Sequence, residues 1–295
     1  MSVNKLNILD CTLRDGGYYN DWDFDAELVS DYLESGTKAG LDFIELGLRQ
    51  FNNTKYRGAH AYTTREYLDR LRLPEGPIYG VMVDAVTILS QKGSQQDCID
   101  RLFLDASDEK ISLVRIAAHF REVPECLPML VRLKEKGYIV GLNIMQASLQ
   151  SESDIIELSE IISPWNCVDV VYFADSLGSM NSADMERVYN ALRSHWNGDL
   201  GFHAHNNMGQ AVANALKAFE LGCNWIDGTV TGMGRGAGNA ETEYLLMAPA
   251  ILRPMEQLNS LFNLVATRFE SMKRSYGWGA SVPYYIGALK SIHPT

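Results

Sequence analysis

The sequence predicts an α/β protein with a (β/α)8 TIM barrel and extra C-terminal helices. Three observations lead to this fold: eight short apolar runs, helical segments between them, and glycines where a helix gives way to a strand. Strands separated by helices require parallel crossovers. Eight such units in about 250 residues fit a closed barrel better than a doubly wound sheet.

The predicted strands are rich in β-branched and aromatic residues. They cover Leu6–Leu13, Asp42–Leu46, Ile78–Val83, Ser112–Ala117, Ile139–Ile144, Val168–Phe173, Leu200–Ala204 and Trp225–Asp227. Between the strands, the spacing of apolar residues predicts helices, which include Asp25–Ala39, Val123–Lys136, Glu152–Ile162, Ala183–Trp196 and Met208–Leu221. Gly40, Gly137 and Gly222 each follow a helical segment and precede a strand, as expected of a left-handed residue that ends a helix.

Two further helical segments follow the last strand, Glu241–Ala248 and Met255–Met272, and two prolines between them should interrupt the helix. No proline- or serine-rich linker divides the chain. We therefore expect a catalytic (β/α)8 barrel over residues 1–250 and a helical extension over residues 251–295 that packs on the barrel.

Composition limits the class of protein. With 46% hydrophobic and 21% charged residues in 295, the chain can bury a large core. A formal net charge of −11 disfavours non-specific binding to nucleic acid or to an anionic membrane. The five cysteines show no CxxC pairing, and residues 1–8 lack a basic region followed by an apolar stretch. We therefore expect reduced thiols, no exported or membrane-spanning segment, and a cytoplasmic location.

Two sequence motifs predict one metal site. The first, DCTLRDGG, begins at Asp10, and the second, GFHAHNN, begins at Gly201. Side chains at positions i and i+2 of a strand point to the same face, so His203 and His205 can direct two imidazoles at one point. Asp15 can add a hard oxygen ligand, and Arg14 a fixed positive charge. Both motifs fall at the carboxyl ends of predicted strands, where barrel enzymes carry their active sites.

Each of these residues also has a structural interpretation. The two histidines could be hydrogen-bonded in a core, Asp15 could cap a turn with Arg14 as its salt-bridge partner, and Asn239 could be a turn residue. Asp175 could form an Asx turn or hold a metal ligand.

Further charged residues lie at other strand ends. Glu45, Asp84 and Arg115 could contact substrate or form a buried charge network, and we assign the substrate contact to Arg115 and to Asp175. The glycine-rich run from Gly232 to Asn239 predicts backbone that passes close to a ligand.

The two motifs and the segment Gly236–Ala240 resemble the pyruvate-aldolase-like (DRE-TIM) metallolyases. This family includes 4-hydroxy-2-oxovalerate aldolase, 3-hydroxy-3-methylglutaryl-CoA lyase, and the isopropylmalate and homocitrate synthases. The resemblance spans residues 6 to 250, and it is nearest to the 4-hydroxy-2-oxovalerate aldolase branch, to which the tail Tyr276–Tyr285 is also similar.

The resemblance implies a divalent metal ion, Mn²⁺ or Mg²⁺, held by Asp15, His203 and His205, with Asn239 as a further ligand. It also implies that Arg14 steadies an enolate oxygen. The expected activity is that of a carbon–carbon lyase, which cleaves or forms a 4-hydroxy-2-oxo acid through a pyruvate enolate. The expected partners are a small 2-oxo acid substrate, a second copy of the chain or an aldehyde dehydrogenase.

The chain departs from the family at Tyr18. The aldolases have a histidine here, proposed as the base for the 4-hydroxyl, whereas the acyl-CoA synthases usually have Glu-Gln where this chain has Gly17-Tyr18. We assign Tyr18 as catalytic, and His119, His60 and a metal-bound hydroxide are rival bases. The alternative functions are a Claisen-type acyl-CoA enzyme, an Fe(II) oxygenase, and a non-catalytic metal-binding barrel that acts as an assembly subunit.

Overall fold

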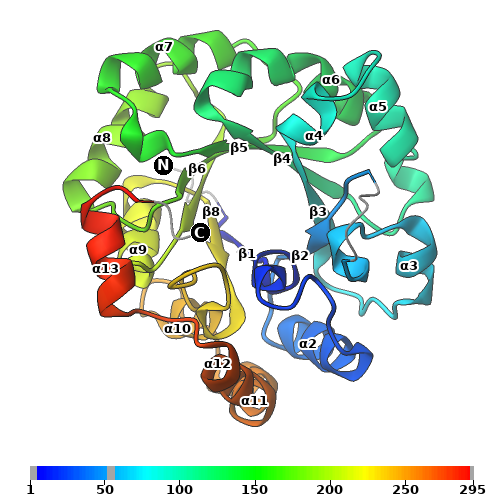
Figure 1. Ribbon diagram of the computed structural model, residues 1–295, viewed down its shortest axis with the longest axis vertical. Coiled ribbons are helices and arrows are strands. Elements are labelled where there is room, and N and C mark those ends of the chain that lie inside the picture. The colour runs from blue at the N-terminus through cyan, green and yellow to red at the C-terminus, as the bar shows by residue number, and fades with distance from the viewer. Residues whose placement is uncertain (1–4, 52–56, 293–295) are drawn as a thin grey trace.

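Eight parallel strands form a closed barrel in chain order, with helices around it (Figure 1). The computed structural model describes residues 5–51 and 57–292. The expectation that residues 1–8 carry no export signal therefore falls partly on residues outside the described ranges. The strands are β1 (Asn7–Asp10), β2 (Phe43–Leu48), β3 (Ile78–Asp84), β4 (Leu113–His119), β5 (Ile139–Met145), β6 (Val170–Asp175), β7 (Asp199–Ala204) and β8 (Trp225–Gly228). The (β/α)8 fold predicted from the sequence is confirmed.

The outer layer consists of helices that follow the strands. They are α2 (Ala26–Lys38), α3 (Arg65–Arg70), α4 (Ala85–Leu89), α5 (Gln95–Leu102), α6 (Leu127–Glu135), α7 (Glu152–Ile162), α8 (Ser182–Arg193), α9 (Ala211–Leu221) and α10 (Thr242–Met247). Gly40, Gly137 and Gly222 have φ values of 73°, 86° and 113°, which confirms their predicted left-handed conformation. None of the helices in the described part of the chain is long and apolar enough to cross a membrane.

The predicted first strand was too long at its carboxyl end. Strand β1 ends at Asp10, and helix α1 (Thr12–Asp15) follows. The Asp10 carboxylate accepts hydrogen bonds from the backbone N–H and the hydroxyl of Thr12, at 2.9 and 2.6 Å, and this local bonding turns the chain out of the strand. The turn brings Arg14 and Asp15 to the mouth of the barrel.

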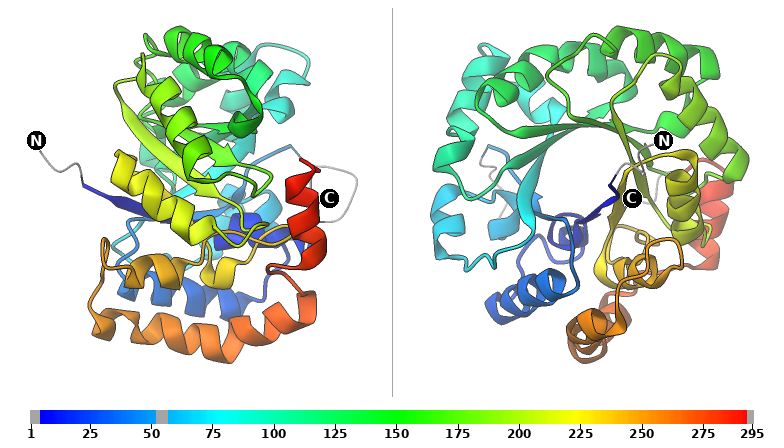
Figure 2. Two further views of the ribbon diagram at one scale, coloured as in Figure 1. Left: turned by 90° about the vertical axis from the view of Figure 1, so that its left-hand side faces the viewer. Right: turned by 180° about the vertical axis from the view of Figure 1, so that it is seen from behind.

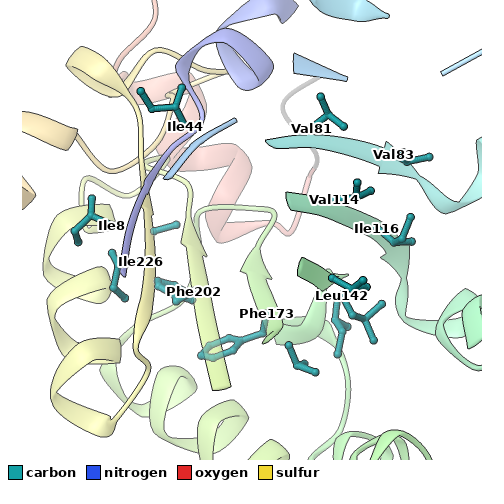
Figure 3. Close-up of a cluster of buried hydrophobic side chains, with 14 of the residues drawn as sticks. Ile8, Ile44, Val81, Val83, Val114, Ile116, Leu142, Phe173, Phe202 and Ile226 are labelled. Atoms are coloured by element: carbon teal, nitrogen blue, oxygen red, sulfur yellow. The ribbon is translucent and has the colours of Figure 1, made fainter. Parts of the chain in front are cut away.

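The apolar core lies on both faces of the sheet. Between strands and helices lies a large cluster that includes Ile8, Val114 and Ile226 (Figure 3). Inside the barrel, a smaller cluster that includes Phe43, Leu113 and Trp225 fills the end where the strands begin. Because successive side chains alternate between the two faces, the inward positions nearer the strand ends are left for polar groups.

Three helices follow α10: α11 (Met255–Leu264), α12 (Glu270–Tyr276) and α13 (Val282–Leu289). Helix α11 packs against α2, where the hydroxyls of Ser35 and Ser260 lie 3.0 Å apart. Helix α13 lies at the end of the barrel where the strands terminate (Figure 2). Its connection to α12 is anchored by Trp278, whose indole N–H donates to the Thr231 carbonyl at 3.1 Å. A separate extension over residues 251–295 stays a prediction.

Candidate active site

Three side chains predicted as metal ligands converge at the mouth of the barrel. His203 is the buried penultimate residue of β7, His205 directly follows the end of this strand, and Asp15 ends α1. One ligand atom from each lies within 4.8 Å of the others. His203 Nε2 lies 3.3 Å from Asp15 Oδ2.

Both imidazoles are fixed through their Nδ1 atoms. His203 Nδ1 lies 2.9 Å from Asp227 Oδ2, and His205 Nδ1 lies 2.9 Å from the backbone carbonyl of Asp175. A histidine whose Nδ1 is held by an acceptor presents Nε2 to a metal, in a fixed ring orientation. The two histidines are therefore oriented as ligands.

The charge states also suit a cation. Burial opposes ionisation of Asp15, but the Arg14 guanidinium, 3.1 Å away, brings the pKa of that carboxyl well below its ordinary value. Burial and the neighbouring His203 lower the pKa of His205 to about 3. The neutral His205 imidazole beside the Asp15 carboxylate has the protonation state that metal ligation requires. For His203, burial favours the neutral ring, but the hydrogen bonds to Asp15 and Asp227 outweigh it and raise the pKa, so a bound metal ion would displace a proton from this ring.

Asn239 completes this cluster from the glycine-rich turn after β8. Its side-chain amide donates to Asp15 Oδ2 at 2.7 Å, while its Oδ1 is buried without a hydrogen-bond partner in the described structure. The turn needs glycine at position 238, where φ is 78° and a Cβ would lie 1.9 Å from the carbonyl oxygen of Gly232. The carboxylate, the two imidazoles and the unpaired amide oxygen are donor types that suit a divalent metal ion.

A second group of potential ligands, Cys11, His203 and Asp227, overlaps the first. Burial raises the pKa of the Cys11 thiol well above its ordinary value, and the thiol contacts the Gly228 carbonyl at 3.5 Å. A protonated thiol is a poor ligand. The cluster of Asp15, His203 and His205 is thus the better candidate for a metal.

A network of buried charges lies beneath the cluster. Glu45 accepts from Arg14 Nε at 2.7 Å and from two nitrogens of Arg115 at 2.8 and 2.9 Å. Arg115 also donates to Asp227 Oδ2 at 2.7 Å, and that oxygen contacts His203. Arg115 is wholly buried, and this geometry fits the charge-network interpretation. Its predicted contact with substrate stays a prediction.

Asp175 shapes the loop after β6. Its carboxylate accepts the backbone N–H groups of Ser179 and Met180, at 3.0 Å each, and burial raises its pKa to about 6. The structure therefore places Asp175 in a turn, and its backbone carbonyl orients His205. That Asp175 also binds substrate stays a prediction.

A cavity of about 250 Å³ opens at the mouth of the barrel. It is lined by Tyr18, Asp84, Val86, Ala117, His119, Glu122, Met145, Gln146, Ser176 and Arg235. Burial, with the charges of Asp15 and Asp84, raises the pKa of Tyr18, so its phenol is protonated at neutral pH. Of the rival bases, His119 lines this cavity.

His60 is held elsewhere. One ring nitrogen contacts the Leu46 carbonyl and the other the Tyr67 hydroxyl, and burial lowers the pKa of His60 to about 4. The His60 ring packs against Phe24 and Tyr67, and both of its nitrogens already have partners. Sequence reasoning did not single out Arg235 or Gln146, which face the cavity, although the glycine-rich run around Arg235 pointed to a ligand.

The fold and the site define a (β/α)8-barrel lyase of the aldolase type. The chain belongs to the HMGL-like family, whose family model matches residues 103–268. It is 32% identical over 251 residues to a 4-hydroxy-2-oxovalerate aldolase of Pelotomaculum thermopropionicum, covering 84% of this chain and 71% of that protein. It is 29% identical over 244 residues to an oxaloacetate decarboxylase of Mycobacterium tuberculosis, covering 82% and 69%.

Solved structures share the fold. The N-terminal domain of an aldolase-like protein from Bacteroides vulgatus superposes with a TM-score of 0.87 at 28% identity, over 98% of this chain and 94% of that one. A hydroxymethylglutaryl-CoA lyase from Pseudomonas aeruginosa gives a TM-score of 0.68 at 17% identity, over 97% and 98%. The latter likeness concerns the fold alone.

Proposed function

We propose that the protein is a divalent-metal-dependent aldolase that cleaves or forms a 4-hydroxy-2-oxo acid through a pyruvate enolate. The convergence of Asp15, His203 and His205 beside Arg14 carries this proposal. The names of the two sequence relatives agree with it chemically. Cleavage of 4-hydroxy-2-oxovalerate and decarboxylation of oxaloacetate both break a bond to C3 of a 2-oxo acid, and both leave the same enolate.

Asp15, His203 and His205 would hold the cation, with the Asn239 oxygen as a further ligand. When bound, the cation supplies a Lewis acid that polarises the 2-oxo group of the substrate.

Arg14 stabilises the negative charge that develops on the enolate oxygen. Its Nε and Nη1 atoms are engaged by Glu45 and Asp15, and its Nη2 is buried with no hydrogen-bond partner in the part of the chain described. A guanidinium keeps its proton at working pH, so this donor stays charged. Fixed donors aimed at a developing oxyanion are among the largest contributions to catalysis.

His119 takes the proton of the 4-hydroxyl, and Tyr18 orients that hydroxyl by a hydrogen bond. Both residues line the mouth cavity, and an imidazole is the commonest general base. As the C3–C4 bond breaks, its electron pair stays on C3 as the enolate and the hydroxyl carbon becomes an aldehyde. Protonation at C3 then yields pyruvate, so the reaction balances without an oxidant or a reductant.

Deuterium exchange tests the proposal without knowledge of the aldehyde. The protein is incubated with Mn²⁺ and pyruvate in D₂O, and the C3 protons are followed by NMR. We expect exchange that EDTA stops and Mn²⁺ restores. A protein that binds Mn²⁺ yet catalyses neither exchange nor aldol addition would disprove the function.

Oxaloacetate decarboxylation is the second candidate, because a relative at 29% identity carries that name. The two reactions are separated by substrate. Faster release of CO₂ from oxaloacetate than of pyruvate from 4-hydroxy-2-oxo acids would favour the decarboxylase.

A further inference from the structure

The mouth cavity carries charged side chains that the proposed chemistry at C3 does not use, among them Asp84 and Arg235. Asp84 comes from the end of β3, and Arg235 from the glycine-rich turn after β8. Tyr18 and His119, assigned above to the 4-hydroxyl, line the same cavity. Asp84 and Arg235 therefore lie where the part of the substrate beyond C4 would be bound.

The Asp84 carboxylate is available to a ligand. Asp84 holds the N-cap position of α4 but makes no side-chain capping bond, although aspartate at this position ordinarily accepts one. Within the described ranges, the structure gives this carboxylate no hydrogen bond and no ion pair. An acidic side chain that forgoes its local bond is free to accept hydrogen bonds from a bound molecule.

The Arg235 guanidinium is equally available. Its Nε is buried without a hydrogen-bond partner among the residues described, and its central carbon lies 5.2 Å from the centroid of the Tyr18 ring. Contact with an aromatic face holds a guanidinium in place and leaves its N–H groups directed sideways. A buried donor left unpaired costs free energy, which a bound acceptor would offset.

The rest of the cavity lining contains both polar and apolar residues. Gln146 has a left-handed backbone, with φ of 57°, and its N–H donates to the Ser176 hydroxyl at 2.9 Å. Val86, Ala117 and Met145 supply the apolar part of the lining. The cavity thus offers donors, acceptors and a limited apolar surface.

We propose that the aldehyde half of the substrate is an uncharged hydroxyaldehyde, with a hydroxyl on the carbon next to the carbonyl. This inference rests on the proposed function and names the acceptor class for the same site. A hydroxyl can donate to Asp84 and accept from Arg235, which pairs both groups. An alkyl chain would leave both unpaired, and an anionic end attracted by Arg235 would be repelled by Asp84 and Glu122.

The reaction in the synthetic direction is an aldol addition. C3 of the pyruvate enolate attacks the aldehyde carbon, one C–C bond forms, and the carbonyl oxygen gains one proton to become the 4-hydroxyl. The product is a 4,5-dihydroxy-2-oxo acid.

Competition between aldehydes tests the proposal. The Mn²⁺-loaded protein is given pyruvate with glycolaldehyde or D-glyceraldehyde, and separately with acetaldehyde, propanal or glyoxylate. We expect kcat/KM to be at least about tenfold higher for the hydroxyaldehydes, since a site built to bind a hydroxyl rejects analogues that lack it. Exchange of pyruvate protons with no such preference would overturn this inference alone, whereas absence of exchange would overturn the proposed function.

Two variants test whether Asp84 and Arg235 cause the preference for hydroxyaldehydes. Asp84→Leu and Arg235→Gln should each lower the ratio of glycolaldehyde to propanal kcat/KM by about tenfold. Asp108→Asn, an exposed substitution before the start of β4 and thus at the opposite end of the barrel, should leave the ratio as it is. If both cavity variants have wild-type circular dichroism and the wild-type ratio, the assignment to Asp84 and Arg235 is wrong.

Discussion

The Arg115 guanidinium and the Glu45 carboxylate share two hydrogen bonds, of 2.8 and 2.9 Å, in the interior of the barrel. Both side chains are wholly buried. Glu45 also holds Arg14, and Arg115 also holds Asp227, which orients His203. One network therefore fixes both Arg14, proposed to stabilise the enolate, and His203, proposed as a metal ligand.

Breaking this pair should destabilise the fold. We expect Glu45→Ala to lower the free energy of unfolding by about 3 to 5 kcal/mol, because it leaves two buried guanidinium groups without a shared partner. Urea denaturation followed by circular dichroism measures the change. Glu34→Ala is the control, since it removes the exposed Glu34–Lys38 pair, which is worth about 0.5 kcal/mol or less. Equal effects of the two substitutions would contradict the network.

Metal binding should depend on Asp227 although it is not proposed as a ligand. We expect Asp227→Asn to weaken Mn²⁺ binding by roughly 10- to 100-fold, because the His203 ring loses the carboxylate that orients it. His203→Ala should abolish measurable binding. Isothermal titration calorimetry with MnCl₂ gives both values, and the exposed His195→Ala is the control. Wild-type affinity in Asp227→Asn would show that the ring needs no such support.

Stability should fall with rising pH through Glu243. Burial raises the pKa of this carboxyl to about 7, although it accepts the Thr231 N–H. The folded state therefore holds a proton that the unfolded state releases at lower pH. This contribution is complete below the unfolded pKa of about 4.5 and is lost as the pH passes 7.

Glu243→Gln removes this dependence. The free energy of unfolding of the variant, relative to that of the wild type, should increase from pH 5 to pH 8 by about 3 kcal/mol at most. Urea titrations at both pH values provide the comparison. The exposed Glu256→Gln on α11 should show no such trend. A pH-independent difference between wild type and Glu243→Gln would refute the assignment.

The proton of the 4-hydroxyl should be taken by His119. We expect His119→Gln to lower kcat by roughly 100-fold in steady-state assays of aldol cleavage. Tyr18→Phe should lower kcat less, since the raised pKa of Tyr18 leaves its phenol protonated and able only to orient the hydroxyl. A larger loss of kcat in Tyr18→Phe than in His119→Gln would reverse the two roles.

Much of the fold followed from local patterns. Apolar runs located the eight strands to within a few residues, and Gly40, Gly137 and Gly222 marked the ends of helices as predicted. The first strand was overextended because Leu13 is apolar and buried although it lies in α1, and the bonding of Asp10 to Thr12 turns the chain there. The pattern of apolar residues predicts which positions are buried, but it does not show which local hydrogen bond ends a strand.

The sequence alone determined the inward pairing of His203 with His205, since strand alternation requires it, and the barrel class brought Asp15 to the same end. Only the tertiary structure decided that Glu45 and Arg115 join Arg14 to Asp227, and that Asp84 and Arg235 share one cavity. These partners come from different strands and turns. Their spacing in the chain carries no information about distance, because closure of the barrel sets which strand ends meet.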